Sequence, residues 1–262
     1  METLAAIAAR GGEAIASLRG AETALGRMLF HAGPELLDLD TTPAAVKQRI
    51  LADVERISRL LLLPPFWRRR IVRMVVEARR TRRGRPVRIL DVGAGAGGLL
   101  HRLEDWARAH RIRVELHGAD FDLDVVAVAQ RRAGEEGRRI DFRPADARRL
   151  DGFDDGCVDI AVTTFMLHHL PPGDVACVLH QLDRVAAVNF FAFDVRRSAL
   201  AVPALWAFLR VGRFDAPTRH DAMASLRRAY TPAELEALLV AAGVAHAQVE
   251  AVPPAWMVAS RA

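Results

Sequence analysis

The apolar positions of this chain follow one spacing before the sequence Gly-Arg-Pro at 84–86 and another after it. Residues 1–85 place apolar side chains at the intervals of amphipathic helices. One helix is expected to begin at Thr42 and Pro43, as cap and first-turn proline, and to end at the Pro-Pro pair 64–65. A second helix is expected after these prolines, so this whole segment is predicted to be helical.

After this boundary, short apolar runs alternate with helical patterns. The run VRILDVG, which starts at Val87, is apolar and ends in glycine, as buried parallel strands often do. Such alternation predicts an α/β fold, a parallel sheet with helices on both faces. The strands expected in this part cover residues 87–93, 113–120, 140–146, 157–167 and 185–193.

The C-terminal part interrupts this alternation and then resumes it. Residues 196–229 have the pattern of helix and loop. In the sequence TPAELEALLVAAG, Thr231 is expected to cap a helix, Glu234 to complete a capping box and Gly243 to end the helix. Two strand-like runs, HAQVEAV and AWMVASR, flank a Pro-Pro turn and are expected to form an antiparallel hairpin at the sheet edge.

The composition indicates a soluble domain with a large core, because 51% of the 262 residues are hydrophobic. No apolar run approaches the ~20 residues of a membrane span, and charged residues interrupt the N-terminus where a signal peptide would be apolar. Cys157 and Cys177 are too few for a disulfide framework and lack metal-ligand neighbours. We therefore expect a cytoplasmic monomer or homodimer without a membrane partner or a metal site.

The formal net charge of +5 comes almost entirely from arginine, because Lys47 is the only lysine. Arginines are dense between Arg68 and Arg88, a pattern also found in nucleic-acid-binding surfaces. Aromatic residues that would stack on bases do not interleave with them after Trp67. The run is therefore interpreted as a solvated helix face followed by a linker, and no nucleic-acid partner is expected.

The sequence LDVGAGAGGLL, at residues 90–100, lies between an expected strand and an expected helix. A glycine-rich loop in this position lets backbone amides approach an anionic group closely. Gly93, Gly95 and Gly98 fit the G-x-G-x-x-G spacing of a dinucleotide site. Gly93, Gly95 and Gly97 equally fit the G-x-G-x-G spacing of a site for S-adenosylmethionine. The glycines alone do not decide between these two cofactors.

Acidic residues at the ends of successive expected strands separate the two alternatives. Asp91 would repel a pyrophosphate but suits the ammonium and sulfonium charges of S-adenosylmethionine. Asp120 can accept both ribose hydroxyls of either cofactor. Asp146 can accept from the adenine amine, while the amide of Ala147 donates to a ring nitrogen. Because these strand ends line one crevice, they favour S-adenosylmethionine together, and Gly98 is then expected to let the next helix pack closely on the sheet.

These sequences resemble the class I S-adenosylmethionine-dependent methyltransferases, in their ubiquinone-biosynthesis-like small-molecule group. The resemblance rests on ILDVGAGAGG, HGADFD, ADARRLDGFDDGCVDIAVTTFMLHHL and TPAELEALLVAAGV, and it spans residues 86–262. The segment FDVRRSAL…TRHDAMASLRRAYTPAEL is similar to enzymes encoded beside secondary-metabolite genes. The resemblance implies a Rossmann-like, seven-stranded, mostly parallel sheet in the order 3-2-1-4-5-7-6. Residues 1–85 would form an N-terminal helical extension or cap, and 196–229 a lid-like insertion.

The resemblance also implies which residues bind the cofactor. Asp91 would lie at the amino group, and Asp120 would bind the ribose, with Phe121 beside it among the cofactor-binding residues. The other implied contacts are Gly93, Gly95 and Gly97 to the methionine part, Asp146 and Ala147 to adenine, Thr164 to the amino group, and Phe165 as a wall near the sulfonium.

A general base is expected if the acceptor is a hydroxyl or an activated ring carbon. The candidates are His168 and His169 in MLHHLPP and His220 in TRHD, because histidine titrates near neutral pH. For the first two, a role in shaping the loop is the alternative, since LHHL accompanies different substrates in this superfamily. Further candidates are Arg196, Arg197 and Arg227 for an acidic or phenolate acceptor, and Phe66, Trp67, Phe165, Met166, Trp206, Phe208 and Phe214 for an apolar lid lining.

The sequence thus predicts methyl transfer to a small hydrophobic acceptor of phenolic or polyketide type, with oxygen as the favoured atom. The alternatives are a carbon methyltransferase of the quinone-biosynthesis type, an NAD-linked oxidoreductase, and a non-catalytic protein that binds S-adenosylmethionine. A methyltransferase for base amino groups would carry Asn/Asp-Pro-Pro-Tyr where this chain has TTFMLHHL. A metal-dependent catechol-type enzyme would need a cluster of acids around that loop, and none is evident in the sequence.

Overall fold

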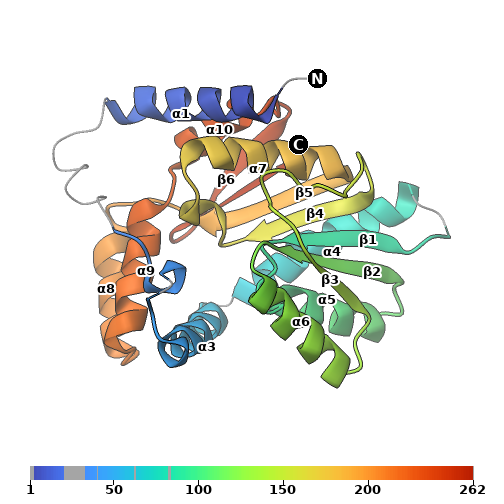
Figure 1. The fold of residues 1–262 in the computed structure, drawn as a ribbon, viewed down its shortest axis with the longest axis horizontal. Helices are drawn as coiled ribbons and strands as arrows, with labels where there is room; N and C mark the ends of the chain where they lie inside the picture. Colours follow the sequence, from blue (N-terminus) through green and yellow to red (C-terminus); the bar gives the residue numbers. More distant parts are fainter. Residues whose placement is uncertain (1–2, 21–32, 40, 62, 82–83, 262) are drawn as a thin grey trace.

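The computed structural model describes the chain except for residues 1–2, 21–32, 40, 62, 82–83 and 262. Its centre is a seven-stranded sheet in the order β3-β2-β1-β4-β5-β7-β6 (Figure 1). This order confirms the fold that the resemblance implied. The strands are β1 (Val87–Val92), β2 (Val114–Asp120), β3 (Ile140–Pro144), β4 (Val158–Thr164), β5 (Ala186–Val195), β6 (Ala247–Val252) and β7 (Trp256–Arg261).

Strands β1 to β5 run parallel, whereas β7 pairs antiparallel with both β5 and β6. The predicted hairpin at the sheet edge is therefore confirmed. All residues of β4 up to Thr163 are buried, as expected for a central parallel strand covered on both faces. Because the parallel strands point the same way, their carboxyl ends share one edge of the sheet, which we call the carboxyl edge.

Two layers of helices cover the sheet. The helices are α1 (Leu4–Gly20), α3 (Ala44–Leu60), α4 (Leu63–Thr81), α5 (Gly98–Ala109), α6 (Leu123–Glu135), α7 (Pro172–Val185), α8 (Ala201–Val211), α9 (Ala216–Arg228) and α10 (Pro232–Ala241), with short 3-10 turns η1 (Leu36–Asp38) and η2 (Leu167–His169). Helices α4, α5 and α6 pack on the face that includes Ile89, and α1, α7 and α10 pack on the face that includes Leu90. Neighbouring residues of β1 thus pack into two separate hydrophobic cores, because side chains alternate between the two faces of a strand.

The segment 196–229 folds as α8 and α9, in agreement with its helical pattern. These two helices contact each other, and α9 also contacts α3 and the turns η1 and η2. Figure 1 shows α3, α8 and α9 together beyond the carboxyl edge of the sheet. None of the described helices is long and apolar enough to cross a membrane.

The N-terminal segment differs from the prediction at its helix boundaries. Thr42 does not cap α3, because Pro43 takes the N-cap position in an extended conformation without a side-chain hydrogen bond. The Pro-Pro pair 64–65 lies in the first turn of α4 instead of ending the preceding helix. Proline is tolerated there because its missing N–H would have no partner in a first turn. The helix expected through 21–32 lies outside the described residues. The capping box at Thr231 is confirmed.

Helix α1 packs directly on α7 through two glycines. A Cβ atom on Gly11 would lie 2.8 Å from Ala176 Cβ and 2.9 Å from the carbonyl oxygen of Pro172. In the other direction, a Cβ on Gly173 would lie 2.6 Å from the carbonyl oxygen of Ala8. Neither position has room for a side chain, so this contact requires glycine on both helices.

We expect Gly11→Ala to lower the free energy of unfolding by about 1–3 kcal/mol, because α1 would have to move away from α7. The matched control is Gly12→Ala, since no described atom lies within 4 Å of a Cβ at Gly12. There alanine should raise stability by about 0.5–1 kcal/mol through its helix propensity. Urea unfolding of both variants tests the pair, and equal effects of the same sign would contradict the packing described.

Candidate active site

The glycine loop joins β1 to α5 at the carboxyl edge. Gly93, Gly95 and Gly97 have φ angles of 72°, 53° and 78°, which L side chains rarely adopt. A Cβ on Gly93 would lie 2.7 Å from Met166 Sδ, and one on Gly97 would overlap the ring of Phe142. At Gly95 no described atom lies within 4 Å of such a Cβ. Packing therefore requires the outer two glycines, whereas Gly95 faces space that a ligand can use.

The predicted role of Gly98 in helix packing is wrong. A Cβ at Gly98 would meet, among the described atoms, the flexible guanidinium end of Arg102 at 3.4 Å. The close approach belongs instead to Gly97 and Gly118, because a Cβ on either would overlap the ring of Phe142. Gly97 is also the left-handed N-cap residue of α5.

Asp91 lies in β1, close before the glycine loop, and is only 2% exposed. Its Oδ1 atom is buried without a hydrogen-bond partner among the described residues. Burial, and secondly the charge of Asp120, raise the pKa of Asp91 to about 8. A buried carboxyl without a partner is costly in its charged form unless a cation approaches it. This position therefore fits an ammonium group, such as that of S-adenosylmethionine.

Asp120 ends β2 and faces the same loop. Its Oδ2 accepts a hydrogen bond from the amide of Gly95 at 3.0 Å, and its Oδ1 accepts from the amide of Asp122 at 3.2 Å. Because a carboxylate offers about four lone-pair positions, it retains capacity for ribose hydroxyls. Phe121 follows directly, and 80% of it is exposed.

Asp146 lies in the turn after β3 and is held there by Arg148. Arg148 donates from Nε to Oδ1 at 2.9 Å and from Nη2 to Oδ2 at 2.7 Å, and its backbone amide donates at 2.9 Å. The side-chain hydrogen bond from Arg148 lowers the pKa of Asp146. An adenine amine would therefore share this carboxylate with Arg148. Ala147 is half-buried in the same turn.

The chain bends sharply where β4 ends at Thr164. Phe165 has a φ angle of 56°, an uncommon conformation for a residue other than glycine. Its amide donates to the carbonyl oxygen of Phe193 at 2.9 Å. The bend brings Met166 against Gly93 of the glycine loop. Strained backbone of this kind clusters at functional sites.

An aromatic cluster lies beside this bend. The rings of Trp67 and Phe193 pack edge-on against Phe165, with centroid distances of 5.7 and 5.2 Å. Phe66 lies 5.6 Å from Phe193. Part of the expected apolar lining therefore gathers at the carboxyl edge.

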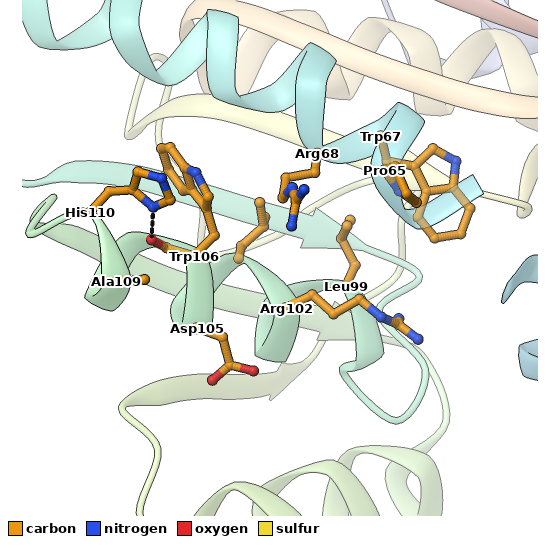
Figure 2. A pocket seen from close by; sticks show the side chains of 10 residues that line it. Pro65, Trp67, Arg68, Leu99, Arg102, Asp105, Trp106, Ala109 and His110 are labelled. Carbon is orange, nitrogen blue, oxygen red and sulfur yellow. Dashed lines mark hydrogen bonds between the residues drawn. The ribbon is translucent and has the colours of Figure 1, made fainter. Parts of the chain in front are cut away.

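The aromatic residues of 196–229 do not join this cluster. Phe208 and Phe214 pack on each other at 5.8 Å, and Trp206 is 54% exposed. Trp206 lines a cavity of about 370 Å³ together with His220 and Arg227. A larger cavity of about 420 Å³ lies between α4 and α5, where Trp67 is one of its lining residues (Figure 2). Neither cavity is lined by the residues expected to bind the cofactor.

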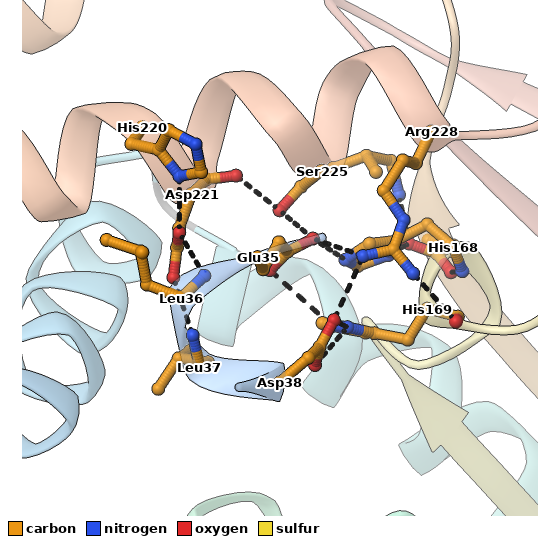
Figure 3. A network of polar contacts seen from close by, with 12 residues as sticks. Glu35, Leu36, Leu37, Asp38, His168, His169, His220, Asp221, Ser225 and Arg228 are labelled. Atoms are coloured by element: carbon orange, nitrogen blue, oxygen red, sulfur yellow. Dashed lines mark hydrogen bonds and ion pairs between the residues drawn. The ribbon is translucent and has the colours of Figure 1, made fainter. Parts of the chain in front are cut away.

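The residues after β4 carry two expected histidines into a group of carboxylates (Figure 3). His168 is buried, with Nδ1 2.6 Å from Asp194 Oδ1 and Nε2 3.6 Å from Glu35 Oε1. His169 has Nδ1 3.0 Å from Asp38 Oδ1 and Nε2 3.9 Å from Glu35 Oε2. We call these five residues the histidine–carboxylate cluster.

Helix α9 supports this cluster. Ser225 Oγ donates to Glu35 Oε1 at 2.9 Å, while Arg228 donates to Asp38 Oδ2 at 2.9 Å and to the carbonyl oxygen of His169 at 2.8 Å. Burial raises the pKa of Glu35 to about 7, although the charge of His169 opposes this. The expectation that no acids surround this loop is therefore wrong. Its cause is long-range folding, because Glu35 and Asp38 come from a segment distant in sequence.

His220 has a different setting from the other two histidines. Its side chain is 52% exposed, with Nδ1 2.9 Å from Asp221 Oδ1. Asp221 in turn accepts from the amides of Leu36 and Leu37 at 2.7 and 3.1 Å, which anchors η1. Figure 3 shows His220 on the side of Asp221 away from the histidine pair. The structure thus joins His168 and His169 and leaves His220 apart.

The three candidate arginines are also separated. Arg197 is nearly buried and pairs with Glu234 at 2.7 Å. Arg196 donates to the carbonyl oxygen of Pro254 at 3.3 Å. Arg227 lines the cavity at α8 and α9. The cation at the histidine–carboxylate cluster is instead Arg228, which the sequence pattern did not single out.

Known proteins are similar to this chain in the sequence around the glycine loop and in the overall fold. Residues 89–189, which include the glycine loop and the ends of β1 to β4, match a family described as a methyltransferase domain. Residues 89–189 thus have the sequence of a methyltransferase domain, and the strand order is the one that the resemblance to the class I S-adenosylmethionine-dependent methyltransferases implied. S-adenosylmethionine is the cofactor of such a domain, and the unpaired Asp91 and the open space at Gly95 fit it.

The demethylmenaquinone methyltransferase of Thermus thermophilus is 35% identical over 121 residues, which are 46% of this chain and 49% of that protein. The match thus spans about half the length of this curated relative. Two solved structures have the same fold. The plantazolicin methyltransferase BamL, in complex with a triazolic desmethylPZN analog and SAH, has a TM-score of 0.60 at 11% identity, covering 99% of this chain and 98% of that one. The methyltransferase SibL has a TM-score of 0.54 at 18% identity, covering 96% and 69%.

The raised pKa of Asp91 has a consequence for stability. The unfolded chain loses this proton near the ordinary aspartate pKa of 3.8, whereas the folded chain keeps it until about pH 8. Between these values the folded state binds more protons, so this group lowers stability as the pH rises. We expect Asp91→Asn to raise the melting temperature of the cofactor-free protein by about 2 °C or more at pH 7.5, and by less at pH 5.

The same substitution should remove the rise in melting temperature that S-adenosylhomocysteine causes, because the partner of its amino group is lost. Differential scanning fluorimetry at the two pH values, with and without the ligand, measures both effects. A variant that is less stable than the parent at pH 7.5, or that still responds fully to the ligand, would contradict the role of Asp91.

Proposed function

We propose that this protein transfers the methyl group of S-adenosylmethionine to a small hydrophobic acceptor, of phenolic or polyketide type, at oxygen. The observation that carries the cofactor part is the buried, unpaired Oδ1 of Asp91 beside the glycine loop. A pyrophosphate would add negative charge at this carboxyl, so an NAD-linked reaction is disfavoured by the same observation.

In this proposal, different residues of the carboxyl edge bind different parts of the cofactor. Asp91 receives the amino group, the loop at Gly93, Gly95 and Gly97 receives the methionine part, and Asp120 receives the ribose hydroxyls. Phe121 and the turn of Asp146 and Ala147 take the adenosine end, where Arg148 must share Asp146. Thr164 and Phe165 border the sulfonium.

The cofactor supplies an activated methyl group, so the protein mainly has to align the acceptor for an in-line displacement. The carbon–sulfur bond breaks as the oxygen–carbon bond forms, and its electron pair stays on sulfur. The acceptor hydroxyl must lose its proton, and the histidine–carboxylate cluster provides the group that takes it up. His169 is the member best suited, because its side chain is 27% exposed whereas His168 is buried.

Two features support the proposed acceptor. The rings of Phe66, Trp67, Phe165 and Phe193 form an apolar wall at the carboxyl edge, which suits an aromatic or polyketide molecule. The adjacent cluster of proton acceptors suits an acceptor that must lose a proton, such as a phenolic hydroxyl. A quinone-type acceptor is the second candidate, because the curated relative is named a demethylmenaquinone methyltransferase.

The proposal includes the domain organisation. Residues 1–85 act as a helical extension and 196–229 as a lid, because η1, α3 and α9 contact one another beyond the carboxyl edge. Residues 86–262 form the cofactor-binding domain. The partner is a small molecule, and the protein works in the cytoplasm as a monomer or homodimer without nucleic acid.

The function is tested by incubating the protein with S-adenosylmethionine and two matched acceptor panels, one of phenols and polyketide-type phenols and one of demethylquinols. Mass spectrometry detects methylated product, and NMR assigns the methyl group to oxygen or carbon. We expect O-methylated product from the first panel. Tight binding of NADH without binding of S-adenosylhomocysteine would contradict the proposal, as would methylation confined to ring carbon.

Once an acceptor has been identified, turnover of the His169→Gln variant can be measured. We expect kcat to fall about 10²–10⁴-fold, because the proton acceptor is lost. The affinity for S-adenosylhomocysteine should not change, because the residue is proposed to lie on the acceptor side. His246→Ala is the matched control, since His246 pairs with Asp183 at 3.0 Å outside the site. His220→Ala tests the other sequence candidate. A full loss in His220→Ala with normal turnover in His169→Gln would move the proton acceptor to His220.

A further inference from the structure

The geometry points to a divalent transition-metal site inside the histidine–carboxylate cluster, with Glu35, His168 and His169 as its ligands. One ligand atom from each of these residues lies within 4.8 Å of the others. Three protein ligands of this kind leave further coordination positions open for a substrate atom or water. The inference rests on the proposed function only in taking the acceptor to bind nearby.

The separations between the ligand atoms suit an ion better than direct hydrogen bonds. His168 Nε2 lies 3.6 Å from Glu35 Oε1, and His169 Nε2 lies 3.9 Å from Glu35 Oε2. Both distances exceed the usual 2.7–3.2 Å of a nitrogen–oxygen hydrogen bond. Ligands about 2.0–2.2 Å from a common ion are separated by intervals of this order.

The opposite ring nitrogens fix the tautomer of each histidine. His168 Nδ1 lies 2.6 Å from Asp194 Oδ1, and His169 Nδ1 lies 3.2 Å from Asp38 Oδ2. A carboxylate only accepts, so Nδ1 carries the hydrogen and Nε2 presents its lone pair to Glu35. Two lone pairs and a carboxylate then face one another, which is unfavourable unless a cation lies between them.

Each candidate ligand also has the outer partner that metal ligands require. Asp194 and Asp38 orient the two imidazoles, and Ser225 Oγ donates to Glu35 Oε1 at 2.9 Å. Histidine ligands usually donate their second ring nitrogen to a carboxylate or carbonyl, and ligating carboxylates are themselves hydrogen-bonded. These outer contacts come from β5, η1 and α9, so three separate elements converge on one point.

The charge balance of the cluster favours a divalent ion. Glu35, Asp38 and Asp194 carry three carboxyl groups into a largely buried space. Arg228 is the cation that reaches them, bonded to Asp38 and 4.0 Å from Glu35 Oε1. One guanidinium balances one carboxylate, so the cluster keeps a negative charge whenever Glu35 is ionised, and a divalent cation would neutralise it.

Two imidazoles and one carboxylate select the type of ion. Nitrogen ligands suit zinc, iron, cobalt and nickel, whereas magnesium and calcium prefer oxygen ligands throughout. We therefore assign the site to an ion of the zinc and ferrous class. Such an ion would occupy the Nε2 lone pair of His169, so in the metal-bound protein His169 would hold the ion instead of taking up a proton. The ion would then lower the pKa of a bound acceptor hydroxyl, and the proton would pass to solvent.

The test uses the full chain without a polyhistidine tag, stripped with a chelator and titrated with Co²⁺. We expect one Co²⁺ per chain, with the visible absorption of cobalt bound to imidazole nitrogen, and displacement by Zn²⁺. Glu35→Gln and His169→Gln should each weaken binding at least ~10-fold, and Asp38→Asn, which acts through His169, should weaken it about 10–100-fold. His246→Ala is the control for surface histidines and should bind as the parent does.

His169→Gln lowers turnover whether His169 holds a proton or an ion, so metal uptake is the readout. Circular dichroism and binding of S-adenosylhomocysteine show that each variant is folded, and the partial exposure of His169 favours this for its variant. Failure of the folded parent to take up Co²⁺, or equal uptake by the Glu35→Gln and His169→Gln variants, would overturn the metal site. Loss of S-adenosylhomocysteine binding by the parent would overturn the proposed function instead.

Discussion

A single carboxyl group, that of Asp91, sets the conditions for the rest of the site. It lies in the interior strand β1 with helices on both faces, and its Oδ1 has no partner among the described residues. Burial makes the charged form costly, which is why its pKa is raised to about 8. The fold could relieve this cost with an apolar residue, so a carboxyl here indicates a cationic ligand. The walls of the space that this ligand would use are formed by the glycine loop, by the bend at Phe165 and by the side chain of Met166, which packs against Gly93.

The histidine–carboxylate cluster depends on a different principle, the convergence of segments that are distant in the sequence. Glu35 on the η1 side, His169 after β4 and Ser225 on α9 meet at one point, although they are far apart in the sequence. The contacts that hold them are mostly hydrogen bonds to charged groups, which are stronger and more directional than apolar contacts. The turn η1 of the N-terminal segment is therefore part of the cluster, and its anchoring by Asp221 couples it to α9.

The sequence predicted the features that arise from local pattern. The strand order, the terminal hairpin and the capping box at Thr231 follow from alternation, turn chemistry and the family resemblance. The position of Asp91 beside the glycine loop was also predictable, because strand ends share an edge. Glu35 was not, since a short turn with several acids looks like any solvated loop. The role of Gly98 was assigned wrongly because close helix approach depends on the partner ring, Phe142, and not on the glycine spacing.

The raised pKa means that Asp91 is protonated in the free protein at pH 7 and should become ionised when the ammonium group of the cofactor binds. Calorimetric titration with S-adenosylhomocysteine at pH 7, in buffers of different ionisation enthalpy, counts the protons released on binding. We expect release of close to one proton per chain, because the free Asp91 has a pKa of about 8 and an ammonium group beside it should lower the pKa of the bound carboxyl well below 7. Binding without proton release, or the same release from Asp91→Asn, would contradict it.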